Sequence, residues 1–328
     1  MRCIMNENYI LGLDIGGTSI KAGIVNKWGN LKGFQTIPTN SSQGPDQVLA
    51  TINTLIQYYQ EQDSISGIGI ALAGSINNKA GVCIYSPNLN WRNVAIGKII
   101  EDSTGTEVRL INDANAACLG EYFFGAGRSY NNIICITIGT GIGSGVILDN
   151  KLFTGNSGLA PEVGHMVLIK DGPRCSCGRK GCWEALVSAS AIIKRAAVEI
   201  NTGTSTMLNE LTGGEKDSLT VQYIFKAWQA GDSLAVDIMT EVKEYLALGL
   251  ANLVNILNPK CIVLGGGIID LDSELTAGLE DMVKELSFPS FKDTVLIKKA
   301  KLGNKAGLVG GASLFLKEIE TLGGQYVN

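Results

Sequence analysis

The fold is decided by the stretch Tyr9-Ile10-Leu11-Gly12-Leu13-Asp14-Ile15-Gly16-Gly17-Thr18, in which a short apolar run ends at an acid and a glycine turn. A second apolar run, residues 20–25, follows at once, so the pattern predicts a strand, a glycine turn and another strand. The pattern returns at residues 133–148, around the turn Gly139-Thr140-Gly141-Ile142-Gly143. Two copies about 125 residues apart indicate an internal duplication.

The composition is that of a globular protein. The chain has 328 residues, which suggests two domains, each large enough to bury its own core. A net charge of -4 without a basic run argues against nucleic acid as a partner. We find no apolar window typical of a signal peptide or a membrane span, so we expect no membrane association. Five of the eight cysteines are scattered through apolar segments, which is typical of reduced core cysteines in a cytoplasmic protein.

The rest of the pattern predicts an α/β protein. Apolar stripes at helical spacing run through residues 45–59 and 234–257, and Pro259 follows the second of them. Residues 66–72, 108–112 and 261–264 have the continuous apolar character of buried strands.

Asn112-Asp113 lies where the strand 108–112 gives way to a predicted helix, 113–124. Ligand crevices of open α/β sheets form at this end of the strands. Asp113 has two interpretations: it caps the helix, or it accepts a proton from a substrate hydroxyl that attacks phosphorus. The spacing alone leaves both open.

The glycine turns are candidate anion sites. Backbone amides in such turns bind phosphate oxygens, and two turns facing each other across a cleft could hold a polyphosphate. Neither turn is a Walker loop or a G-x-G-x-x-G motif. A single turn of this kind is more often an ordinary hairpin, but the duplication and Asp14 favour the phosphate interpretation.

The chain's only histidine, His165, is followed by Cys175, Cys177 and Cys182. One imidazole and three thiolates form the closed, tetrahedral ligand set that structural zinc prefers. The alternative is a surface histidine beside incidental thiols. Glu162 and Glu184 flank this motif and could bind vicinal sugar hydroxyls, unless they are only solvated surface charges.

These motifs together resemble the ROK family of sugar kinases and regulators, and most closely its bacterial glucokinase branch. The similarity extends from about residue 9 to about residue 316 and rests on Leu13 to Lys21, Asn112 to Ala117, Ile138 to Gly143, Glu162 to His165, Cys175 to Glu184 and Leu264 to Gly267.

The resemblance implies an actin-like ATPase fold, with two ribonuclease-H-like lobes around a central cleft. We therefore expect an N-terminal lobe of residues 1–127, joined by a C-terminal helix at about 306–328. The C-terminal lobe would comprise residues 128–305 and contain the zinc motif, 165–182. Family members are often dimers or tetramers, so we also expect a homo-oligomer.

The resemblance also implies a role for each motif. Asp113 would be the general base for the 6-hydroxyl of a hexose, which is bound by Gly74, Asn112, Asp113, Glu162, His165 and Glu184. ATP with Mg²⁺ would lie at Asp14, Gly16, Gly17, Thr18 and Lys21, at Gly139, Thr140 and Gly141, and at Gly265, Gly266 and Gly267. A structural Zn²⁺ would be held by His165, Cys175, Cys177 and Cys182, which leaves one histidine nitrogen for the sugar.

The expected activity is that of an ATP-dependent hexose kinase, with glucose as the leading substrate. Alternative substrates are N-acetylmannosamine, N-acetylglucosamine, mannose, fructose and allose, and polyphosphate is an alternative donor. A different class is a sugar-sensing regulator of the same family, with or without a DNA-binding domain. Only thirteen residues precede Asp14, which argues against a DNA-binding helix-turn-helix at that end.

Overall fold

The computed structural model describes residues 9–215, 218–291 and 294–316. The chain divides into two compact units, the first made of residues 1–135, 145–161 and 300–328, and the second of residues 136–144 and 162–299. The lobe boundary expected between residues 127 and 128 stays a prediction. Residues 317–328 of the expected C-terminal helix lie outside the described residues.

The first unit is built on a five-stranded sheet with the order β3-β2-β1-β4-β8. Its strands are β1 (Tyr9–Ile15), β2 (Ser19–Val25), β3 (Leu31–Pro38), β4 (Ile65–Leu72) and β8 (Val108–Asn112). The strands β1, β2 and β3 are antiparallel, whereas β1, β4 and β8 are parallel. The strand, glycine turn and strand predicted at the start of the chain are confirmed.

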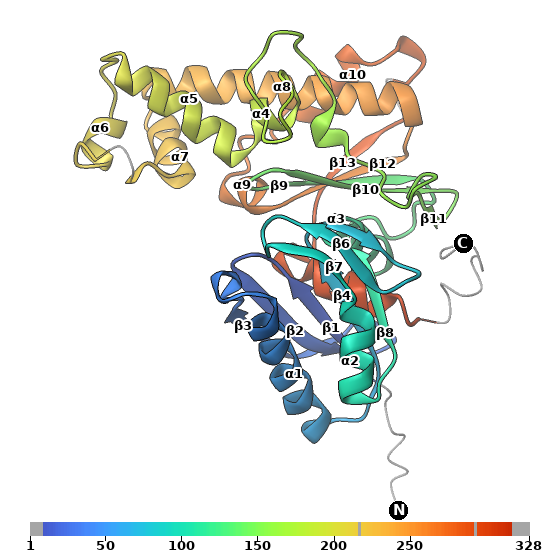
Figure 1. Cartoon of the computed structure of the whole chain (residues 1–328). Coiled ribbons are helices and arrows are strands. Elements are labelled where there is room, and N and C mark those ends of the chain that lie inside the picture. The colour runs from blue at the N-terminus through green and yellow to red at the C-terminus, as the bar shows by residue number, and fades with distance from the viewer. Residues whose placement is uncertain (1–8, 216–217, 292–293, 317–328) are drawn as a thin grey trace, which may run out of the picture. The chain divides into compact units, whose positions relative to one another are not determined.

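Helices pack on both faces of this sheet (Figure 1). They are α1 (Pro45–Gln62), α2 (Ile96–Thr104), α3 (Asp113–Phe124) and α11 (Ala306–Ser313). Side chains such as Leu11 and Leu13 join the core under α1 and α2, while α11 packs on the opposite face beside α3. A Cβ at Gly12 would lie 2.3 Å from the backbone oxygen of Leu308, so glycine in β1 allows α11 to approach the strand closely.

A small antiparallel sheet belongs to the same unit. It consists of β5 (Ser75–Asn77), β6 (Val82–Ser86) and β7 (Trp91–Val94). The hydroxyl of Ser86 donates to the carbonyl of Ala73 at 2.6 Å. This bond ties the small sheet to the loop that contains Gly74.

The second sheet has the order β11-β10-β9-β12-β13. Its strands are β9 (Ile133–Ile138), β10 (Ile142–Leu148), β11 (Lys151–Leu152), β12 (Cys261–Gly265) and β13 (Leu296–Lys299). Like the first sheet, it consists of a hairpin with a glycine turn, a third outer strand beyond the hairpin and two further strands on the other side. The internal duplication is therefore visible in the strand order.

Within the described residues, seven α-helices belong to the second unit. They are α4 (Glu184–Val187), α5 (Ala189–Asn201), α6 (Leu208–Leu211), α7 (Val221–Gln229), α8 (Ser233–Leu257), α9 (Gly267–Leu271) and α10 (Leu279–Leu286). The predicted long helix is α8, whose apolar stripe is buried against α5, α7 and α10. It begins with an Asp232 cap and ends at Asn258, which is left-handed. Short 3₁₀ turns occur at η1 (Ser41–Gln43), η2 (Val163–His165), η4 (Pro289–Phe291) and η5 (Gly303–Lys305).

Among the described helices, none is both long and apolar enough to cross a membrane. Four cysteines outside the histidine motif are buried and form no disulfide among the described residues, as expected of core cysteines: Cys83, Cys118, Cys135 and Cys261. The fifth, Cys3, lies outside the described residues.

Candidate active site and metal centre

The first glycine turn has all its carbonyl groups occupied by hydrogen bonds. The hydroxyls of Thr39 and Ser41 donate to the carbonyls of Gly16 (2.6 Å) and Gly17 (3.0 Å). The amide of Thr39 donates to the carbonyl of Thr18 at 3.0 Å. The peptide planes of this turn are therefore held by the segment that follows β3.

The second glycine turn is held in the same way from the start of α5. The amide of Ala189 donates to the carbonyl of Gly139 at 2.8 Å, and the hydroxyl of Ser190 donates to the carbonyl of Thr140 at 2.9 Å. The amide of Gly139 closes the turn onto the carbonyl of Gly141 at 2.9 Å.

The amide groups of the two turns differ from the carbonyl groups in their hydrogen bonding. Within the described part of the chain, the N–H groups of Gly17, Thr18, Thr140 and Gly141 have no hydrogen-bond acceptor. Unpaired amides in fixed peptide planes are suited to bind an anion such as a phosphate oxygen. The duplicated turns thus fit the phosphate segments expected from the sequence.

Asp14 stands at the end of β1, beside the first turn. Its Oδ2 accepts a hydrogen bond from Lys21 Nζ at 2.8 Å, and its side chain is 14% exposed. A Cβ at Gly307 in α11 would lie 2.9 Å from the carboxylate. Glycine at position 307 therefore leaves room for the Asp14 carboxylate, which a larger side chain in α11 would displace. The ammonium group of Lys21 faces the carboxylate.

Asn112 organises the end of β8. Its Oδ1 accepts hydrogen bonds from the amides of Ala114 and Asn115, so Asn112 is the N-cap of α3. The interpretation of Asp113 as the cap is therefore wrong, because Asp113 is the first residue of the helix. The Asn112 side-chain amide donates to the carbonyl of Gly74 (3.1 Å) and to Asp113 Oδ1 (3.0 Å). These bonds bring together Gly74, Asn112 and Asp113, the residues of the first unit that are expected to bind the sugar.

The third glycine segment joins β12 to α9: Gly265 ends the strand, Gly266 follows it, and Gly267 begins the helix. Gly266 has φ 93°, and a Cβ there would lie 2.5 Å from the carbonyl oxygen of Ile138. The conformation and the contact both require glycine. The structure thus brings this segment to the end of β9, next to the second glycine turn.

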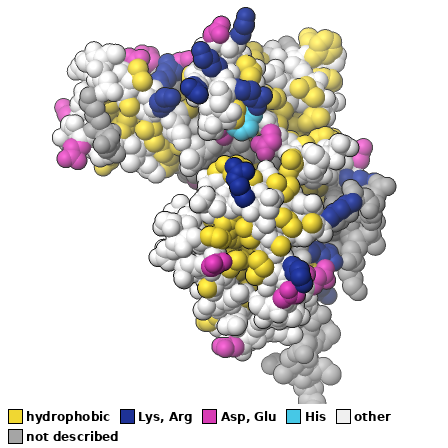
Figure 2. Space-filling model, viewed as in Figure 1, with side chains coloured by type: hydrophobic (Ala, Val, Ile, Leu, Met, Phe, Trp, Pro, Cys, Tyr) yellow, Lys and Arg dark blue, Asp and Glu magenta, His cyan; other side chains and the backbone are white. Residues whose placement is uncertain are grey.

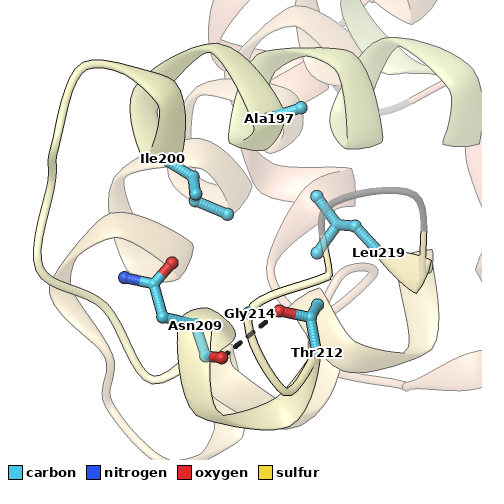
Figure 3. Close-up of a pocket in the computed structure, with 6 residues that line it drawn as sticks. All are labelled: Ala197, Ile200, Asn209, Thr212, Gly214 and Leu219. Atoms are coloured by element: carbon cyan, nitrogen blue, oxygen red, sulfur yellow. Dashed lines mark hydrogen bonds between the residues drawn. The ribbon is translucent and has the colours of Figure 1, made fainter.

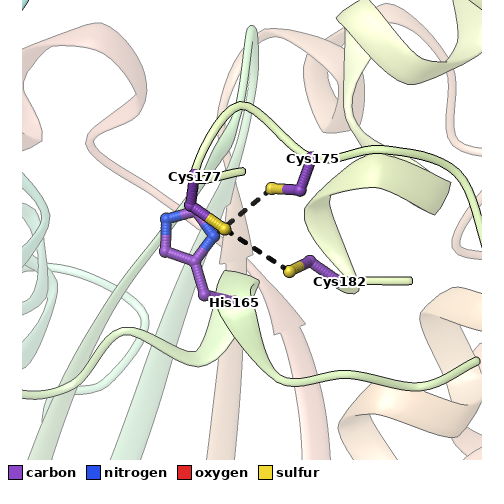
Figure 4. Close-up of side chains that lie close together, drawn as sticks. All are labelled: His165, Cys175, Cys177 and Cys182. Atoms are coloured by element: carbon purple, nitrogen blue, oxygen red, sulfur yellow. Dashed lines mark hydrogen bonds between the residues drawn. The ribbon is translucent and has the colours of Figure 1, made fainter. Parts of the chain in front are cut away.

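The expected zinc ligands converge (Figure 4). The four ligand atoms of His165, Cys175, Cys177 and Cys182 lie within 4.8 Å of one another. The Sγ atoms of Cys177 and Cys182 are 3.7 Å apart, and Cys175 Sγ is 3.6 Å from His165 Nδ1. Tetrahedral zinc with bonds of about 2.3 Å to sulfur and about 2.0 Å to nitrogen would separate these pairs by about 3.8 Å and about 3.5 Å. The residues present therefore fit a zinc ion.

The surroundings of two expected zinc ligands, Cys177 and Cys182, shift their thiol pKa values in opposite directions. Hydrogen bonds from the backbone and side chain of Arg179 lower the pKa of Cys177 to about 6, whereas burial raises the pKa of Cys182 to about 12. A metal ion would offset the cost of a buried Cys182 thiolate. The knot, residues 165–182, also has exposed basic side chains at Lys170, Arg174, Arg179 and Lys180, and Figure 2 shows Lys and Arg side chains around the single histidine.

Glu184 begins α4, two residues after the last cysteine of the knot. Its Oε2 accepts the amide of Ile142 at 3.0 Å, and its Oε1 accepts the hydroxyl of Ser176 at 3.0 Å. Glu162 lies close to Glu184 and His165: exclusion of water, and to a lesser extent the Glu184 charge, raises the pKa of its carboxyl, while His165 acts in the opposite direction. The structure thus brings Glu162, His165 and Glu184 into one cluster.

A separate small hollow lies among α5, α6 and the segment before α7 (Figure 3). It is lined by Ala197, Ile200, Asn209, Thr212, Gly214 and Leu219. None of these residues is titratable, and none was expected in a functional site. We therefore assign no chemistry to this hollow.

Several residues that hold the site were not expected from the sequence. No sequence motif assigned a function to these residues, which are Ser176, Ser190, Thr39, Ser41 and Gly307. All except Ser176 lie far along the chain from the groups that they contact. Ser176 offered the only signal, since it stands between two predicted zinc ligands.

The two sheets with the same strand order and paired glycine turns define the class of the protein, which has the actin-like ATPase fold. Residues 10–318 match the model of the ROK family. Over 307 residues the chain is 35% identical to a glucokinase of Streptomyces coelicolor, covering 93% of this chain and 96% of the relative. The chain belongs to the ROK family.

Two solved structures show how the family uses this fold. A ROK family glucokinase from Streptomyces griseus, crystallised with glucose and AMPPNP, has a TM-score of 0.81 and 33% identity, covering 94% of this chain and 99% of that one. A ROK family transcriptional regulator homologous to the E. coli Mlc protein has a TM-score of 0.84 and 27% identity, covering 96% of this chain and 79% of that one. Both catalysis and regulation thus occur on this architecture.

Proposed function

We propose that the protein is an ATP-dependent hexose kinase that phosphorylates the 6-hydroxyl of glucose. The observation that carries this proposal is the position of Asp113, whose carboxylate is held at the end of β8 by the 3.0 Å bond from Asn112. A base fixed in this way suits proton removal from a hydroxyl. The similarity to glucokinases favours glucose over the other hexoses.

In the proposed reaction, Asp113 accepts the proton of the 6-hydroxyl while that oxygen attacks the γ-phosphorus of ATP and ADP leaves. Gly74, Asn112, Glu162, His165 and Glu184 bind the sugar. This transfer depends mainly on positioning and charge stabilisation, which agrees with the number of hydrogen bonds that hold Asn112 and Glu184.

The nucleotide is assigned to the glycine segments. Gly16, Gly17, Thr18 and Lys21 would bind phosphate oxygens from the first unit, and Gly139, Thr140 and Gly141 from the second. Gly265, Gly266 and Gly267 would contact the adenosine. Mg²⁺ would reach the site with ATP and lie near Asp14, where it would neutralise phosphate charge.

A structural Zn²⁺ held by His165, Cys175, Cys177 and Cys182 completes the proposal. Because Nδ1 of His165 faces Cys175, Nε2 remains for a sugar hydroxyl. A homo-oligomer, a cytoplasmic location and the absence of nucleic-acid binding remain predictions.

The first test is a coupled assay of the purified protein with a panel of hexoses and with ATP or polyphosphate as donor. Asp113→Asn is expected to lower kcat by about 10² to 10⁴ while sugar affinity changes little. Asp46→Asn is the matched control, because Asp46 is also an acid in the first turn of a helix and has no proposed role. Substantial turnover by Asp113→Asn would refute the assigned base.

A sugar-sensing regulator is the second candidate, because the fold of the regulator matches this chain as closely as that of the glucokinase does, with TM-scores of 0.84 and 0.81. In that case the wild-type protein would bind a hexose in calorimetry without transferring phosphate from any donor in the panel.

A further inference from the structure

The carboxylate of Glu184 connects two parts of the second unit. Its Oε2 accepts the amide of Ile142, the first residue after the second glycine turn, and its Oε1 accepts the hydroxyl of Ser176. A Cβ at Gly141 would lie 2.4 Å from Oε2, so the carboxylate rests directly on the turn. Ser176 stands between two of the knot cysteines.

The backbone that leads into Glu184 is fixed by its neighbour. Trp183 is fully buried, and its indole nitrogen donates to the carbonyl of Tyr245 at 2.9 Å. Gly249 in α8 provides the space for the ring, since a Cβ there would lie 2.2 Å from it. With the main chain held, the direction of the Glu184 carboxylate is set by its two hydrogen bonds.

One of these bonds comes from a hydroxyl that has a competing partner. Ser176 Oγ is 3.0 Å from Glu184 Oε1 but 3.8 Å from Cys175 Sγ, so the carboxylate is the better acceptor. As a free thiol, Cys175 donates to Oε1 at 3.7 Å, but as a zinc-bound thiolate it would no longer donate and would repel the carboxylate. A hydroxyl that donates to Oε1 offsets this repulsion.

We propose that Ser176 is a positioning residue for sugar binding, through which the metal knot orients Glu184. Each carboxylate oxygen accepts about two hydrogen bonds, so one position on each oxygen remains for the hydroxyls of a sugar. Without the Ser176 hydroxyl, Oε1 turns away from Cys175, and only the Ile142 amide holds the group. This inference rests on the proposed function, in which Glu184 binds the hexose.

The experiment compares Ser176→Ala and Ser176→Thr with the wild type, all carrying zinc. Glucose binding without nucleotide is measured by calorimetry, zinc content by elemental analysis, and KM for sugar and for ATP in the coupled assay. We expect Ser176→Ala to weaken glucose binding about five- to tenfold with unchanged zinc content, and Ser176→Thr to restore it.

Ser190→Ala is the matched variant. It also removes one exposed serine hydroxyl from the second unit, but that hydroxyl bonds the carbonyl of Thr140 in the glycine turn. We expect it to raise KM for ATP and to leave glucose affinity near that of the wild type.

The outcomes separate the two proposals. If the wild type binds glucose and Ser176→Ala binds it equally well, or loses its zinc, the positioning role is refuted and the kinase assignment stands. If the wild type binds no hexose at all, the proposed function is refuted, and the inference about Ser176 is refuted with it.

Discussion

At the scale of single residues, two glycines in α11, Gly307 and Gly310, occupy very different environments. A Cβ at Gly310 would lie 1.7 Å from the backbone oxygen of Ala116, whereas at Gly307 the nearest atoms, at 2.9 Å, are those of the Asp14 carboxyl group. Backbone cannot move aside without shifting α3, but a carboxylate can rotate. The same substitution should therefore damage the fold at one position and the site at the other.

Gly310→Ala is expected to destabilise the protein by about 3 kcal/mol, since overpacking against rigid backbone cannot be relieved. Gly307→Ala should keep a melting temperature near that of the wild type, because alanine is favoured in helices by about 0.5–1 kcal/mol. By displacing Asp14 it should raise KM for ATP about tenfold. Thermal unfolding and ATP kinetics of both variants test this contrast. A Gly307→Ala protein with normal ATP kinetics would show that Asp14 does not serve the nucleotide.

At the scale of elements, Glu121 holds the end of α3 to two other segments. It is 2% exposed, and its carboxylate accepts the amides of Ala126 (2.7 Å), Lys301 (3.0 Å) and Leu302 (2.7 Å). The first amide belongs to the loop after α3, and the others lie just before η5 and α11. The buried Glu121 carboxylate thus accepts hydrogen bonds from the loop after α3 and from the segment before α11. The helix α3 begins with Asp113, the proposed base.

Glu121→Ala is expected to lower the free energy of unfolding by about 3 kcal/mol, because three partly buried amides lose a buried carboxylate acceptor. Glu107→Ala is the comparison: Glu107 forms an exposed ion pair with Arg109, and its loss should change stability by less than about 1 kcal/mol. Urea unfolding of both variants measures the difference. Similar, small losses would mean that water replaces the carboxylate.

The elements could be predicted from the sequence because their patterns are local. The glycine turns and the α8 stripe each lie within a short stretch of chain, and the structure bears them out. The cysteine spacing is equally local, and the structure brings its four ligand atoms within 4.8 Å of one another. The sequence could not decide whether Asp113 caps the helix, because Asn and Asp are equally good at that position; in the structure Asn112 is the cap. Thr39, Ser190 and Glu121 could not be found, since they act on segments that only the folded chain brings near them.

At the scale of the whole molecule, the two copies of the duplicated sheet carry different chemistry. The first unit has the acid Asp14 beside its glycine turn and Asp113 at the end of β8. In the second unit no acid precedes the turn along the chain. The carboxylate beside that turn is Glu184, which follows the metal knot and lies close to Glu162. In the proposed enzyme, proton transfer and the magnesium site therefore belong to the first copy, and the zinc-ordered sugar contacts to the second.

This division predicts how zinc removal affects the two substrates. The knot reaches Glu184 through Ser176, whereas the peptide planes of the second glycine turn are held from α5 by Ala189 and Ser190. Treatment with a chelator, followed by desalting and assay in excess Mg²⁺, should raise KM for sugar several-fold more than KM for ATP. Added zinc should reverse the effect, and Cys177→Ser should reproduce it with lowered metal content. Equal changes in both KM values, accompanied by a lower melting temperature, would mean that the knot stabilises the second unit as a whole and has no particular role in sugar binding.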